Sequence, residues 1–182
     1  MVREKGVRQV PEDEAAIVSD FYPIASLVTI DLGCANACLS EWGHKMGPIV
    51  RGNNAREICH ALTHEDRPIA IATSSPLIRE KVGGCEGFTR ENTIELSRLC
   101  AARPGLCRVM LRLWREFIFP TLGKEFAISY QDAALHSGNL YRFDGWQRIA
   151  YSRSGTDSRS GRNGRNKWVW VWPVSTGKKG AA

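Results

Sequence analysis

The chain has 182 residues, of which 43% are hydrophobic and 24% charged, a composition of an ordinary globular protein rather than of a disordered or fibrous one. No apolar run approaches the ~20 residues that cross a bilayer, and the charged N-terminus leads into no apolar signal core, so we expect a cytoplasmic protein without a membrane partner. The formal net charge of +6 favours a polyanionic partner.

A chain of this length suits one folded domain with a full core. We expect residues 1–20 to be a peripheral lead-in, residues 21–174 to form the domain, and residues 175–182 to be a tail.

The first half of the chain predicts two strands and two helices. Residues 26–31 are short and β-branched, which is typical of a strand. Residues 35–42 predict a helix that Gly43 ends. Residues 54–62 have apolar residues at a helical spacing, and residues 67–73 form a short apolar strand.

The second half alternates strands with helices. Pro104 and Gly105 open a strongly apolar helix that runs to residue 118, and Pro120 ends it. The other predicted elements are strands at 92–100, 126–130, 147–151 and 167–174, a short helix at 138–143, and a loop at 152–166 rich in Gly, Ser and Arg. This mixture favours an α/β sandwich over a helical bundle or an all-β barrel.

Positive charge is concentrated in the last quarter of the chain. Residues 142–182 contain nine Lys and Arg against two acidic residues, whereas the other 141 residues contain 16 basic and 17 acidic ones. Four tryptophans at 146, 168, 170 and 172 lie in the same region. Arg beside exposed aromatic rings suits stacking on nucleic-acid bases, but alternating Trp and Val also packs one face of a strand, and a basic loop is often only solvated.

The segment 128–146 contains most of the candidate chemistry. Tyr130, Asp132, His136 and Tyr141 follow a short apolar run, and side chains with chemical roles often lie where a strand passes into a loop. Each also has a structural alternative, such as a turn for Asp132 or a packed ring for Tyr141.

Three segments resemble the Mom family of phage DNA-modification proteins, within the GNAT superfamily of acetyltransferases. They are His44-Lys45-Met46-Gly47, the strand Ile94-Glu95-Leu96-Ser97-Arg98-Leu99, and Ser129-Tyr130-Gln131-Asp132 followed by His136-Ser137-Gly138 and Tyr141. Two departures stand out, because Lys45 replaces the family's usual Tyr and residues 103–108 lack the usual acetyltransferase phosphate loop.

The resemblance implies an α/β (α+β) GNAT-like acyltransferase fold with a mixed central sheet flanked by helices. It also implies an enzyme that transfers an acyl-derived, methylcarbamoyl-like group to adenine N6 in double-stranded DNA and so protects phage DNA from restriction. Acyl-CoA as donor, an iron ion, a location in the bacterial host cytoplasm and a homodimer are further expectations of this interpretation.

The candidate catalytic residues are His44, Glu95, Arg98, Asp132 and Tyr141. Asp132 would orient an exocyclic amine, Glu95 would act as a base, and Tyr141 would protonate a departing thiolate. His44 and Asp132 together are the candidate ligands of a metal ion.

The candidate cofactor site lies at the junction between the strand 92–100 and the helix that follows. A helix N-terminus has free N–H groups and the positive end of the helix dipole, which suit a pyrophosphate. The residues assigned to it are Arg103, Gly105, Leu106 and Arg108. Candidate nucleic-acid contacts are Trp146, Arg153, Arg159, Arg162, Arg165 and Lys167.

Two other functions stay open. One is an ordinary N-acetyltransferase that acts on a small amine, a protein or an aminoacyl-tRNA. The other is a nucleic-acid-binding protein without catalytic activity.

Overall fold

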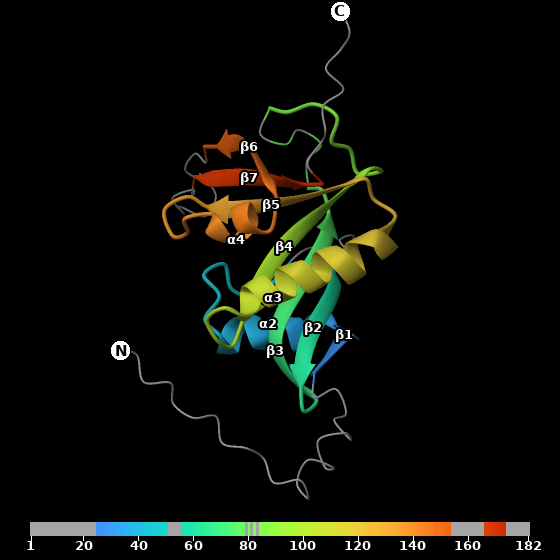
Figure 1. The fold of residues 1–182 in the computed structure, drawn as a ribbon, viewed down its shortest axis with the longest axis vertical. Helices are drawn as coiled ribbons and strands as arrows, with labels where there is room; N and C mark the ends of the chain where they lie inside the picture. The colour runs from blue at the N-terminus through green and yellow to red at the C-terminus, as the bar shows by residue number, and fades with distance from the viewer. Residues whose placement is uncertain are drawn as a thin grey trace, which may run out of the picture.

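The computed structural model describes residues 25–50, 56–78, 80, 82, 84–153 and 166–173. The described strands form one seven-stranded sheet in the order β1-β2-β3-β4-β5-β7-β6 (Figure 1). They are β1 Ala25–Ile30, β2 Ile58–His64, β3 Arg67–Pro76, β4 Thr93–Ala101, β5 Phe126–Asp132, β6 Gln147–Ser152 and β7 Lys167–Trp172. Neighbouring strands are antiparallel except β4 and β5, which are parallel.

Helices cover both faces of the sheet (Figure 1). The helical segments are α2 Leu32–Glu41, α3 Leu106–Leu113, the π-helical turn η2 Trp114–Ile118, the 3₁₀ turn η3 Phe119–Leu122, and α4 Asn139–Phe143. α2 packs on one face of β2, β3 and β4, whereas α3, η2 and α4 pack on the opposite face. We call these the α2 face and the α3 face.

The start of α2 depends on Asp31, which follows β1 directly. The Oδ1 atom of Asp31 accepts a hydrogen bond from the backbone N–H of Cys34 at 2.7 Å, so it satisfies one of the free amides of the first turn. The predicted helix at 35–42 is therefore confirmed, with an earlier start. Ala35 and Leu39 are buried against the sheet.

The helix predicted at 54–62 is wrong. Residues 58–64 form β2, and residues 54 and 55 lie outside the described part of the chain. Cys59 and Ala61 pack on the α2 face while Leu62 packs on the α3 face. A strand that is covered on both faces has apolar residues at spacings that also fit a helix, so periodicity alone cannot separate the two.

The long apolar helix continues past the point predicted for its end. α3 is followed by η2 and then by η3, in which Pro120 lies in the first turn, and the path ends at Gly123 with φ of +62°. Proline is tolerated there because a first-turn N–H needs no helical partner. Within η2, Trp114 is fully buried and donates its indole N–H to Ser74 Oγ at 2.9 Å.

The remaining predicted strands and the short helix at 138–143 are confirmed, and β3 and β5 extend further than predicted. β5 ends at Asp132, which makes this residue the last of its strand. The expected lead-in 1–20 and tail 175–182 lie outside the described residues. None of the described helices has the length and apolar character needed to span a membrane.

Candidate active site

The parallel strands β4 and β5 separate after a short stretch of pairing. They pair only at Thr93–Phe126, Ile94–Ala127 and Glu95–Ile128 in the described structure. Beyond these pairs the strands diverge, and a cavity of about 810 Å³ lies between their C-terminal halves. A concave cavity of this size, lined by both apolar and polar side chains, is typical of a ligand site.

A β-bulge lies on the β4 side of the cavity. Thr73 of β3 pairs with Arg98 and Ser74 pairs with Leu96, which leaves Ser97 as an extra residue in β4. The Ser97 hydroxyl lies 2.8 Å from Thr73 Oγ1 and donates to Glu57 Oε2 at 3.3 Å. Bulges bend a strand and interrupt its hydrogen-bond ladder, and they often occur beside active sites.

A buried pair of hydroxyl groups lies on the β5 side. Ser129 Oγ donates to the backbone oxygen of Leu96 at 3.0 Å, and it lies 2.8 Å from the Tyr141 hydroxyl. Ser129 therefore connects the two strands where their backbones separate. Tyr141 is 8% exposed and lines the cavity. Burial raises the pKa of Tyr141 to about 12, although the hydrogen bond with Ser129 partly opposes the shift.

The loop after β5 forms the next wall of the cavity. Asp132 Oδ1 accepts hydrogen bonds from the backbone N–H groups of Ala134 and Leu135 at 3.0 and 3.2 Å, so it organises a turn. Gln131 connects the loop to the core. Its Oε1 accepts from the Trp170 indole at 2.8 Å, and its Nε2 donates to the His136 backbone oxygen.

The loop after α2 closes the cavity from the α2 face. It contributes Trp42, His44 and Lys45 to the lining. His44 is half-buried, and its Nδ1 atom accepts a hydrogen bond from the Met46 backbone N–H at 3.3 Å. Lys167 also lines the cavity, and its ammonium group lies 5.7 Å from the centre of the Tyr130 ring.

Side chains from both faces of the sheet line the cavity. Tyr141 belongs to the core on the α3 face, whereas Tyr130 packs with the opposite cluster, and both line the cavity.

Four of the five predicted catalytic residues meet at this cavity. His44, Arg98, Asp132 and Tyr141 all line it, although they come from three separate parts of the chain. Glu95 is only 8% exposed and is the last β4 residue that pairs with β5, so it lies where the strands begin to separate.

The predicted cofactor residues lie next to the cavity rather than in its lining. Of the β4–α3 junction, Ala101 and Cys107 line the cavity, whereas Arg103, Gly105 and Arg108 are exposed and Leu106 is half-buried. Gly105, with φ of +89°, is the N-cap residue of α3. Because glycine has no side chain, it forms no capping hydrogen bond with the free N–H groups of the first turn.

The predicted nucleic-acid contacts are divided. Arg153 is exposed and Lys167 lines the cavity, while Arg159, Arg162 and Arg165 lie outside the described residues. The expected stacking surface at Trp146 is wrong, because this side chain is 4% exposed and packs in the core.

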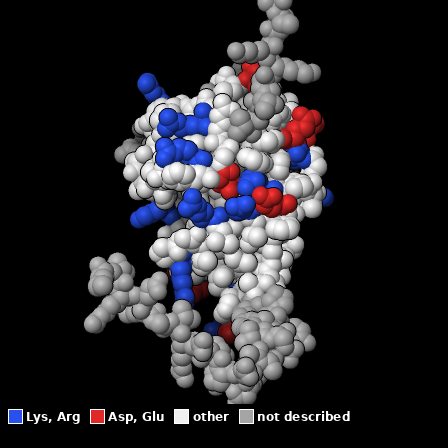
Figure 2. All heavy atoms as spheres, viewed as in Figure 1, with Lys and Arg blue, Asp and Glu red and all other residues white. Residues whose placement is uncertain are grey.

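A different group of arginines gathers on the surface. Figure 2 shows basic side chains clustered over α4, β6 and the start of α3. Arg108 and Arg142 both lie over the exposed Phe143 ring, at 5.4 and 4.8 Å from its centre, and Arg148 lies over Trp168 at 4.2 Å. We call Arg108, Arg142 and Arg148 the arginine patch.

A metal centre finds no support in the described residues. They contain no group of three or more His, Cys, Asp or Glu side chains arranged to hold a metal ion. His44 and Asp132 line the same cavity, but the Oδ1 atom of Asp132 accepts two backbone N–H groups. The residues do not fit the iron ion that the resemblance implied.

Several residues of the site had no identified role in the sequence. Ser97, which donates to Glu57, is the extra residue of the β4 bulge, and the bulge leaves no mark in the amino-acid pattern. Ser129 and Gln131 belong to the segment singled out, but a Ser or Gln on a strand is ordinary. Their roles depend on partners 12 and 39 residues away.

Comparison with protein-family models and with curated protein sequences finds no match. Solved structures do match. A ribosomal-protein alanine N-acetyltransferase from Escherichia coli is 15% identical with a TM-score of 0.55, and the match covers 87% of this chain and 99% of that one. The Arabidopsis thaliana protein NAA60, in complex with acetyl-CoA, is 11% identical with a TM-score of 0.56, and the match covers 81% and 97%.

A variant of the spermidine N-acetyltransferase from Vibrio cholerae is also 11% identical with a TM-score of 0.56, and the match covers 82% of this chain and 94% of that one. The chain has the GNAT acetyltransferase fold. The expectation of that fold is therefore confirmed. Within this fold, β4 and β5 separate after a short stretch of pairing, and the cavity lies between them.

Proposed function

We propose that the chain is an N-acyltransferase, which transfers an acyl group from a coenzyme A thioester to an amine. One observation carries this proposal. The cavity at the separation of β4 and β5 has a buried tyrosine hydroxyl on one side and a β-bulge on the other. The GNAT fold and similar structures that are named as N-acetyltransferases support it.

The N-terminus of α3 and the arginine patch are suited to a donor with several phosphates. Arg103 and Arg108 flank this N-terminus, and Arg142 faces the same Phe143 ring as Arg108. A helix N-terminus and guanidinium groups both favour phosphate oxygens. When bound, a coenzyme A thioester supplies an activated acyl carbon and a thiolate leaving group.

The β4 bulge is suited to the acyl carbonyl group. At Ser97 the strand is displaced from its ladder with β3, and from Leu96 onward β4 no longer pairs with β5 in the described structure. Backbone N–H groups at such a position can stabilise negative charge on a carbonyl oxygen, which would develop as the amine attacks.

Tyr141 is suited to protonate the leaving sulfur. Its raised pKa keeps the hydroxyl protonated near neutral pH. Because Ser129 gives its one hydrogen to Leu96, the Tyr141 hydrogen points to Ser129 Oγ and can turn towards the cavity. In the transfer a carbon–nitrogen bond forms and the carbon–sulfur bond breaks. The sulfur takes the Tyr141 proton, and solvent restores that proton as it accepts one from the amine.

A Mom-type activity on DNA is a second candidate. Under this proposal a methylcarbamoyl-like group goes to adenine N6 of double-stranded DNA. The arginine patch and the excess of basic residues over 142–182 favour an anionic partner. The same patch also suits the phosphates of the donor, which is why the amine acyltransferase stands first.

Product analysis tests both candidates together. The purified protein is incubated with acetyl-CoA and one acceptor at a time. The acceptors are spermidine, a peptide with N-terminal alanine, and duplex DNA. Plasmid DNA from expressing cells is digested to nucleosides, and all products are analysed by mass spectrometry. An acetylated amine that Tyr141→Phe fails to form supports the first candidate. A new adenosine mass that Asp132→Ala abolishes supports the second. Unchanged acceptors in every arm would contradict both.

A further inference from the structure

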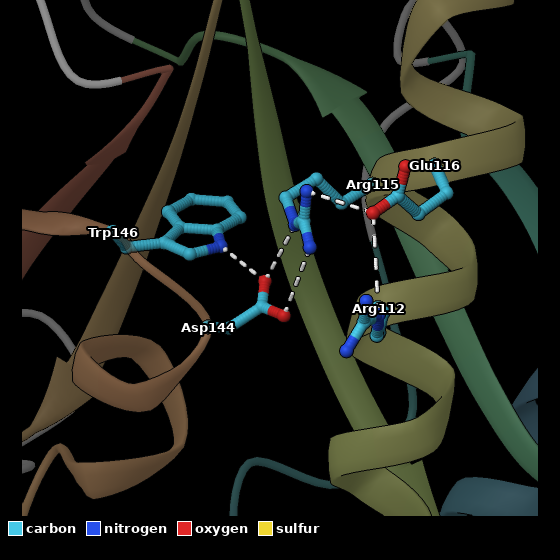
Figure 3. Close-up of polar contacts among 5 residues, drawn as sticks. All are labelled: Arg112, Arg115, Glu116, Asp144 and Trp146. Carbon is cyan, nitrogen blue, oxygen red and sulfur yellow. Dashed lines mark hydrogen bonds and ion pairs between the residues drawn. The ribbon is translucent and has the colours of Figure 1, made fainter.

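An ion pair away from the cavity lining joins η2 to the turn after α4. Arg115 Nε lies 2.9 Å from Asp144 Oδ2, and Arg115 Nη2 donates to Asp144 Oδ1 at 3.4 Å (Figure 3). The two side chains are only 15% and 6% exposed. A bidentate pair of this kind fixes both distance and orientation.

Neighbouring aromatic rings complete this arrangement. The Trp146 indole N–H donates to Asp144 Oδ2 at 3.0 Å, so one carboxylate receives donors from both sides (Figure 3). The Arg115 guanidinium lies 4.5 Å from the centre of the Trp172 ring in β7. Arg115 belongs to the π-helical turn η2, and such turns are frequent at functional sites.

Asp144 and Trp146 hold Tyr141 directly through the backbone. The Tyr141 carbonyl oxygen accepts from the N–H of Asp144 at 3.1 Å and from the N–H of Trp146 at 3.0 Å. Its ring lies between Trp146, edge-on at 5.4 Å, and Trp170, stacked at 5.6 Å. The placement of Asp144 and Trp146 therefore sets the position of the Tyr141 ring.

α4 needs this external support. It has five residues and its N-cap is Gly138, which offers no side-chain hydrogen bond. An isolated helix of one turn is unstable, so the orientation of its side chains depends on tertiary contacts. Within the described part of the chain, the Arg115–Asp144 ion pair connects the C-terminal turn of α4 to the helical path of α3 and η2.

We propose that Arg115 and Asp144 are positioning residues that hold the Tyr141 hydroxyl on Ser129 and in line with the leaving sulfur. The proposal rests on the acyltransferase function given above. Neither residue touches the reacting atoms. Both act through Trp146 and the α4 turn, and a displacement of about 1 Å at Tyr141 would cost up to ~100-fold in rate.

Arg115→Met and the milder Arg115→Lys test the proposal, with Arg112→Met as the matched control. Arg112 lies one turn earlier on the same helical path. Its side chain is 72% exposed, and it lies 4.0 Å from Glu116. Circular dichroism and thermal unfolding establish which variants fold. If Arg115→Met does not fold, Arg115→Lys takes its place, because it keeps the charge but loses the bidentate geometry.

Kinetics with acetyl-CoA, water serving as the acceptor, give the first readout. We expect Arg115→Met to lower kcat about 10- to 100-fold, with KM for acetyl-CoA within about threefold. In a Tyr141→Phe background the same change should add less than about twofold, because the group that it positions is already gone. Losses that multiply in the double variant would overturn the proposal.

A second readout needs no activity. In protein labelled with fluorotyrosine, the ¹⁹F NMR signal of Tyr141 is assigned by its loss in Tyr141→Phe. Arg115→Met and Arg115→Lys should shift this signal while Arg112→Met leaves it in place. An unshifted signal would refute the positioning role. Absence of acetyl-CoA turnover and binding in the parent protein, with a shifted signal, would instead refute the acyltransferase function alone.

Discussion

The chemistry of the site depends on how Tyr141 is surrounded. Its ring is enclosed by tryptophans and its hydroxyl lies 2.8 Å from Ser129 Oγ. Burial disfavours a phenolate, so the pKa is raised from 10.0 to about 12. A hydroxyl that stays protonated suits a proton donor, and it excludes a role for Tyr141 as a base near neutral pH.

The raised pKa of Tyr141 predicts that stability falls at high pH. Below pH 10 the residue is protonated in both states. Between pH 10 and about 12 the unfolded chain loses the proton while the folded protein keeps it. The free energy of unfolding should then decrease by about 1.4 kcal/mol per pH unit through this residue. Urea unfolding from pH 8 to pH 11.5 measures the slope.

Tyr141→Phe is the control, because it lacks the ionisable group. Its pH slope should be shallower than that of the parent by about 1.4 kcal/mol per unit above pH 10. Lysines and the other tyrosines contribute equally to both proteins. Equal slopes would mean that the Tyr141 hydroxyl is not buried in the folded state.

Residue identity alone predicted part of the site. Tyr141 and Asp132 were selected because polar-tipped residues crowd the segment after the strand, and both line the cavity. The ion pair that supports the Tyr141 turn was not predictable in the same way. Arg115 and Asp144 are 29 residues apart, and in the sequence each looks like an ordinary surface charge. They meet only when the helical path and α4 pack together.

The loop between β5 and α4 depends on one glycine. A Cβ atom on Gly138 would lie 2.6 Å from both Gln131 Oε1 and Trp170 Cζ2, and its φ is +78°. In Gly138→Ala, the alanine must adopt an unfavourable left-handed backbone conformation. Its Cβ atom also displaces the buried hydrogen bond between Trp170 and Gln131. We expect a loss of about 3 kcal/mol or more in the free energy of unfolding, measured in urea.

Gly123→Ala separates the two causes. Gly123 also has a positive φ, +62°, but no atom lies within 4 Å of a Cβ there. This variant should lose only about 1 kcal/mol, the cost of the backbone conformation. Similar losses in both variants would contradict the tight packing of Gly138 against Gln131 and Trp170.

Element boundaries were predictable where local signals were strong. The strand at 126–130 and the helix opened by Pro104 and Gly105 follow from turn residues and apolar runs. The helix predicted at 54–62 failed because β2 is covered on both faces. The β4 bulge and the η2 turn depend on tertiary packing, so no local sequence pattern predicts them.

At the scale of the whole molecule the fold was predicted and the acceptor was not. The predicted order of strands and helices, together with the resemblance of three motifs, led to the GNAT fold, which the solved structures confirm. The substrate depends on charges and rings around the cavity. Lys45, Arg98 and Lys167 are cationic while Asp132 is anionic, and such a mixture suits more than one amine.

The net charge is also a property of the whole molecule. The excess of basic residues over 142–182 predicted a polyanionic partner. Among the described residues, Arg142 and Arg148 of this region belong to the arginine patch, and Arg142 shares the Phe143 ring with Arg108 of α3. Under the two proposals, donor phosphates and a nucleic acid would compete for the same surface, so donor binding is the first quantity to measure.

Isothermal titration of the protein with acetyl-CoA tests the central claim most directly. We expect one acetyl-CoA site per chain. Arg108→Glu should lower the affinity for acetyl-CoA about tenfold or more, because the new carboxylate would repel the donor phosphates. Arg67→Glu, an exposed change at the start of β3, should have no effect. No binding at millimolar acetyl-CoA, or equal affinities in both variants, would contradict the proposed donor site.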